Sequence, residues 1–67
     1  MTAVYIQYRP GDRVRIKGTE IEGIVLRVVV GPHEAIVYEV QYWEEREPMQ
    51  YQAYDIEIDL VEAYIAG

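Results

Sequence analysis

RPGDRVRIK, at residues 9–17, carries the strongest indication of fold in this chain. Its Pro-Gly-Asp segment is typical of a turn. After the turn, the apolar Val14 and Ile16 alternate with the basic Arg13, Arg15 and Lys17. A turn followed by strict alternation predicts a half-buried β-strand at residues 13–17.

Similar runs predict further strands along the rest of the chain. Residues 21–30 form a long β-rich run, in which Gly23 indicates a bulge or a close approach of two backbones. Residues 36–43 and 49–54 predict two more strands, separated by a charged turn at residues 44–48.

The two ends of the chain are less regular. Residues 3–8 are rich in β-formers and predict a leading strand or arm. Residues 55–58 predict a short helical turn, after which residues 59–66 fit either a last strand or a terminal helix. The expected fold class is therefore all-β, with an antiparallel arrangement of short strands.

Alternation also predicts which side chains of residues 36–43 enter the core. Tyr38 and Val40 lie on one face of this strand, together with Tyr42, and we expect them in the core. Glu39 and Trp43 lie on the opposite face, which we expect to be exposed.

The size of the chain limits how it can be stabilised. Its 67 residues make a single domain, residues 1–67, with a core formed by residues 10–60 and an arm at residues 1–9. The absence of cysteine excludes disulfides and thiolate metal sites, and the single histidine, His33, offers no histidine cluster. Because so short a chain buries a small core, self-association is the remaining source of stability.

Charge sets limits on the partners. The net charge of −6 argues against binding to the phosphate backbone of nucleic acids. We expect the basic side chains at residues 13–17 to pair with acidic strands of the same domain or of a neighbouring subunit. No apolar run is long enough to cross a membrane, and no secretory signal is visible, so we expect a cytoplasmic protein.

Candidate binding residues come from the aromatic content, which includes seven tyrosines and one tryptophan. Such side chains combine an apolar body with a polar tip and suit binding surfaces. Trp43 is the best candidate for contact with a ligand. Tyr38, Tyr51 and Tyr54 offer an alternative, an aromatic cage for a methylated amine. The chain contains no serine or cysteine, which argues against covalent hydroxyl or thiol catalysis.

An expected interface lies at the end of the second strand. Val28, Val29 and Val30 give that strand two apolar faces, in a domain too small to cover both. We expect this segment to be buried on both sides or to form a contact between subunits.

The pattern as a whole resembles that of small SH3-like barrels, which include Tudor-like and KOW-type domains and many phage and bacterial proteins. The resemblance rests on residues 11–14 opening a strand, residues 23–25 opening the next, residues 38–40 in the third and residues 55–58 before the last. It implies a five-stranded, strongly bent antiparallel barrel, a fold that serves many functions.

A second resemblance is to the type II, plasmid-borne dihydrofolate reductases, tetramers of SH3-like barrels around one pore. Residues 11–15 and 22–25 are similar to that family's first strands, and residues 49–52 to its pore-lining Val-Gln-Ile-Tyr stretch. The resemblance implies that Gln50, Tyr51 and Gln52 line a pore in which NADPH and substrate bind, since the family's glutamine and tyrosine at these positions bind cofactor and substrate. Gln52 stands where the family has tyrosine, and Ile16 stands where it has a lysine that binds the cofactor.

Two functions follow as expectations. The first is a non-catalytic binding or assembly module, without a cofactor, that contacts a protein partner or its own copies. The alternative is a reductase of the type II kind, which would bind NADPH in the central pore of a tetramer.

Overall fold

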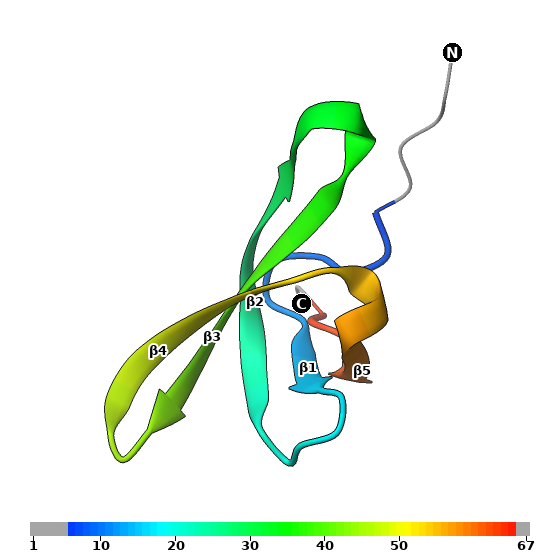
Figure 1. Cartoon of the computed structure of the whole chain (residues 1–67). Helices are drawn as coiled ribbons and strands as arrows, with labels where there is room; N and C mark the ends of the chain where they lie inside the picture. The colour runs from blue at the N-terminus through cyan, green and yellow to red at the C-terminus, as the bar shows by residue number, and fades with distance from the viewer. Residues whose placement is uncertain (1–5, 66–67) are drawn as a thin grey trace.

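A five-stranded antiparallel sheet makes up most of the chain, as Figure 1 shows. The structure is a computed structural model that describes residues 6–65, apart from the side chain of Glu34. The strands lie in the order β4-β3-β2-β1-β5. They comprise β1 (Arg13–Ile16), β2 (Glu22–Val30), β3 (Ile36–Glu44), β4 (Glu47–Ala53) and β5 (Ile58–Glu62).

Two short 3-10 helices complete the described part of the chain, which holds no α-helix and confirms the all-β prediction. They are η1 (Pro32–Glu34) between β2 and β3, and η2 (Asp55–Glu57) directly before β5. The second confirms the helical turn expected there. Strands β4 and β5 are the two edges of the sheet, which is not closed.

Several predicted boundaries were wrong. The last element is a strand that ends at Glu62, so the helical alternative for residues 59–66 was wrong for its described part. Residues 6–8 form no strand, and residues 1–5 of the expected arm lie outside the described part of the chain. Strand β4 begins at Glu47 because Glu44 and Glu47 already pair across a tight turn.

Gly23 lies where two backbones approach closely. A Cβ atom at this position would lie 2.6 Å from the carbonyl oxygen of Gln41 and 2.6 Å from Cγ1 of Val40. The close approach predicted from the sequence is thus present. The bulge lies elsewhere, because the pairing of β2 with β3 shifts register between Val25 and Arg27.

The core lies on one face of the sheet, where each strand contributes at least one buried side chain. It comprises Tyr8, Val14, Val25, Tyr38, Val40, Ala53 and Ile58. The rings of Tyr8 and Tyr38 meet edge to face, with centroids 5.1 Å apart. The Tyr38 hydroxyl accepts a hydrogen bond from the backbone N–H of Gln7 at 2.9 Å, and the Tyr8 hydroxyl donates to the Ile58 carbonyl at 3.1 Å.

Candidate functional site: the outer face of the β3–β4 hairpin

The pairing of β3 with β4 brings most of the predicted binding residues to one face of the hairpin. Gln50 lies opposite Gln41, Gln52 opposite Glu39, and Trp43 opposite Pro48. Directly opposed residues of antiparallel strands place their side chains on the same face. We call these six residues the outer face of the hairpin.

Tyr51 is separated from this group. It lies opposite Val40, on the core face of the sheet, and is half-buried. Its hydroxyl donates a hydrogen bond to Oε2 of Glu57 at 2.8 Å, while Oε1 of Glu57 accepts from the backbone N–H of Tyr54 at 2.9 Å. The three residues of the predicted Gln50-Tyr51-Gln52 set therefore point to two different faces.

These hydrogen bonds shift the acidities of both side chains. The Tyr54 N–H and then the Tyr51 hydroxyl lower the pKa of Glu57, because both stabilise its carboxylate. The same carboxylate raises the pKa of Tyr51. The Tyr51 hydroxyl is therefore held by η2 rather than turned toward a ligand.

Trp43 is exposed, with 58% of its surface accessible. Next to it, the hairpin turns through Glu45 and Arg46, both with positive φ angles of 49° and 72°. Such two-residue turns normally use Asn-Gly, because other residues adopt positive φ only under strain. The hairpin thus holds a large aromatic side chain in solvent beside a strained turn.

The aromatic cage considered from the sequence does not form. Tyr38 is only 1% exposed, and its hydroxyl is occupied by the backbone of the segment before β1. Tyr51 is bound to Glu57, so it offers no open wall beside Tyr54.

The valine segment lies at the far end of β3 from Trp43. Val29 pairs with Val37 on one face, and Val28 pairs with Tyr38 on the other. Val28 packs against the core, whereas Val29 is 42% and Val30 is 50% exposed. Exposed apolar side chains therefore lie at both ends of the long β2–β3–β4 region, Val29 and Val30 at one end and Trp43 at the other.

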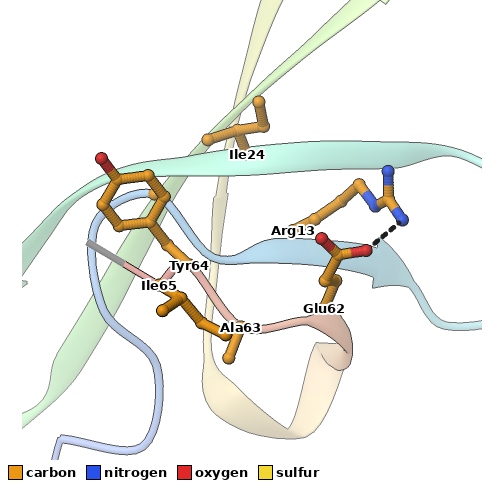
Figure 2. A pocket seen from close by; sticks show the side chains of 7 residues that line it. Arg13, Ile24, Glu62, Ala63, Tyr64 and Ile65 are labelled. Atoms are coloured by element: carbon orange, nitrogen blue, oxygen red, sulfur yellow. Dashed lines mark hydrogen bonds and ion pairs between the residues drawn. The ribbon is translucent and has the colours of Figure 1, made fainter. Parts of the chain in front are cut away.

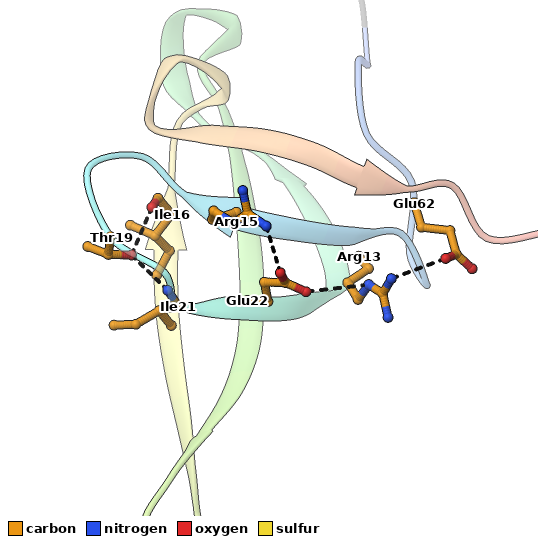
Figure 3. Close-up of polar contacts among 7 residues, drawn as sticks. All are labelled: Arg13, Arg15, Ile16, Thr19, Ile21, Glu22 and Glu62. Carbon is orange, nitrogen blue, oxygen red and sulfur yellow. Dashed lines mark hydrogen bonds and ion pairs between the residues drawn. The ribbon is translucent and has the colours of Figure 1, made fainter.

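The basic side chains of residues 13–17 are engaged within the chain, as Figure 3 shows for Arg13 and Arg15. Arg13 binds Glu62 at 3.1 Å, Arg15 binds Glu22 at 2.8 Å, and the Lys17 ammonium lies 3.7 Å from Asp59. The hydrogen bond from Arg15 lowers the pKa of Glu22. These contacts confirm the predicted pairing with acidic strands of the same domain.

Two buried charges were missed, Asp12 and Glu39. Glu39 lies on the outer face as alternation predicts, but it is only 7% exposed rather than solvated. Its Oε2 accepts a hydrogen bond from Nε of Arg27 at 2.7 Å. The two residues face each other across β2 and β3, so the register of those strands creates this ion pair.

A hollow of about 500 Å³ lies away from the hairpin, beside β1 and the segment after β5. Figure 2 shows it between Ile24 of β2, the Arg13–Glu62 ion pair and the ring of Tyr64. None of the residues singled out from the sequence as binding residues lines it. The residues that line it come from segments far apart in the chain, so no local sequence pattern predicts the hollow.

No group of three His, Asp or Glu side chains within residues 6–65 is placed to hold a metal ion. None of the helices described here has the length and apolar character needed to cross a membrane.

No protein-family model, curated protein or solved structure matches this chain.

Proposed function

We propose that this chain is a non-catalytic, cytoplasmic assembly module with an SH3-like arrangement of strands, and that it binds its own copies. The observation that carries the proposal is the exposure of Val29 on one face and of Val30 on the other face at the end of β2, which leaves apolar side chains on both sides of this strand. Exposed apolar surface of this kind is typical of sites that contact another protein.

The arrangement of the strands supports the SH3-like part of the proposal. Strand β2 pairs with β1 through residues 22–24 and with β3 from Ile24 to Val30, so one long strand belongs to both halves of the sheet. A 3-10 turn, η2, precedes the last strand. The helical turn before the last strand is one of the features on which the resemblance to small SH3-like barrels rests.

We expect the substitution Val29→Lys to lower the mass of the protein in solution. The added ammonium would have to lose its water in any contact made by this segment, which is unfavourable. Light scattering after gel filtration gives the mass, and circular dichroism checks that the β-structure is kept. Ile56→Lys is the matched control, since Ile56 is exposed on η2 and the substitution adds the same charge. A wild-type protein that is monomeric at high concentration contradicts the proposal.

The reductase alternative gives a different measurable result, and we expect NADPH oxidation with dihydrofolate to be absent or barely detectable. Type II catalysis depends on positioning two ligands in one pore. Ile16 has no donor for the cofactor phosphate, and Lys17 lies beside Asp59. A spectrophotometric assay tests this, with Gln50→Ala as control. Turnover that disappears in the control variant would place the reductase function first.

A further inference from the structure

We propose that the free edge of β4 pairs with β4 of a second copy, antiparallel and around a two-fold axis, to form one continuous sheet. This inference rests on the proposed self-association and names a surface for it. It differs from the valine segment, which lies at the other end of β3.

The edge of β4 is open. Figure 1 shows the β3–β4 hairpin extending away from β1 and β5. Within the described residues, no backbone hydrogen bond reaches Glu47–Ala53 from outside the β3–β4 ladder. An edge strand leaves about half of its backbone N–H and C=O groups unpaired, and these groups are a template for another strand.

The other edge of the sheet is protected against such pairing. Strand β5 carries Asp59 and Glu62, which lie beside Lys17 and Arg13. The Tyr8 hydroxyl also occupies the carbonyl of Ile58. Charged side chains and covering groups are the usual protection of edge strands. After Glu47, strand β4 has no charged residue, and Pro48 is its one residue without a backbone N–H, so the segment from Met49 to Ala53 is left free to pair.

Charge favours a second copy as the occupant of this edge. Copies with a net charge of −6 repel each other over most of their surface. Residues 48–54 are uncharged, so two copies can approach there with little local repulsion.

The sequence of β4 is also complementary to itself. With Tyr51 opposite Tyr51 of the second copy, Gln50 lies opposite Gln52 and Met49 opposite Ala53. Amides then face amides on the outer face, and apolar side chains face apolar side chains on the core face. A two-fold axis repeats each of these contacts, as in most homodimers. A single added strand buries less surface than a permanent dimer, so the pairing is reversible.

Two double variants test the edge. Gln50→Lys with Gln52→Lys places ammonium groups opposite one another across the proposed two-fold axis, and within the chain it places one opposite Glu39. Val29→Lys with Val30→Lys adds the same charge at the other surface. Both variants reduce the overall negative charge, which by itself favours association. In sedimentation equilibrium we expect the β4 variant to lose at least about tenfold in association constant.

The outcomes separate the two proposals. If only the valine variant dissociates, self-association stands and the pairing through β4 is wrong. If the wild-type protein does not associate at all, both proposals are wrong. Circular dichroism and the thermal midpoint of each variant show whether a lower mass reflects unfolding.

A cross-linking experiment tests the register. The chain has no cysteine, so Gln50→Cys and Gln52→Cys each carry a single thiol. Under mild oxidation, a mixture of the two variants should form a mixed disulfide, because directly opposed residues lie within disulfide range. Each variant alone should stay uncross-linked, since its own thiols would be about 7–8 Å apart on the diagonal. A disulfide that forms equally well in Gln50→Cys alone overturns this register.

Discussion

Replacing Gly23 by alanine is expected to lower the midpoint of thermal unfolding by roughly 4–24 °C. The added methyl group would lie 2.6 Å from the backbone oxygen of Gln41, a distance that real Cβ atoms essentially never show. The second contact, with Val40, belongs to the core. Because the first obstacle is backbone, β2 and β3 must separate locally. Overpacking of this kind costs about 1–3 kcal/mol, and each kcal/mol shifts the midpoint of so small a domain by about 4–8 °C.

Gly31→Ala is the matched control for this prediction. The nearest atom to a Cβ at Gly31 is the carbonyl oxygen of Ala35 at 3.6 Å, which is an ordinary contact. Its φ of −95° is also accessible to alanine. Both substitutions make the same change to the unfolded chain, so the difference between their midpoints measures the close approach at Gly23. Equal midpoints would show that the strands yield without cost. Circular dichroism during heating is sufficient for the comparison.

Gly23 also shows how far local sequence reasoning reaches. A glycine inside a strand indicates a bulge or a close approach, and the sequence does not distinguish the two. The choice depends on which residues of β3 lie opposite β2, and the register shift in fact falls between Val25 and Arg27. Alternation along one segment is enough to predict a strand. The position of a bulge depends on how two strands pair, so it cannot be predicted from one segment alone.

Some features of the candidate site likewise follow from the local sequence, whereas others depend on contacts between strands. Alternation alone places Trp43 on the face opposite Tyr38 and gives Gln50 and Gln52 a common face. The burial of Glu39 depends on Arg27, a residue of another strand. The hydrogen bond between Tyr51 and Glu57 depends on how η2 is placed after β4. Side-chain contacts between different elements are therefore the features of the site that could not be predicted from the sequence.

The side chain of Asp12 joins two segments that are distant in the sequence, the turn before β1 and the segment after β5. It is only 6% exposed. Its Oδ2 accepts a hydrogen bond from the backbone N–H of Arg9 at 2.9 Å, which closes the turn before β1. Its Oδ1 accepts one from the N–H of Tyr64 at 2.9 Å, which holds the segment after β5 against that turn.

Asp12→Ala is expected to destabilise the fold by about 2–4 kcal/mol, because it removes a charged acceptor from two backbone N–H groups at once. The midpoint of thermal unfolding should fall by roughly 8–32 °C. Asp12→Asn keeps one acceptor oxygen, so its effect should be intermediate. Glu20→Ala removes an exposed carboxylate and controls for the change in charge.

Amide hydrogen exchange then locates the effect: in Asp12→Ala the Tyr64 N–H should lose protection before the core strands do. Unchanged protection of that N–H would show that the segment after β5 is held by other contacts, such as the ring of Tyr64 against Gly11.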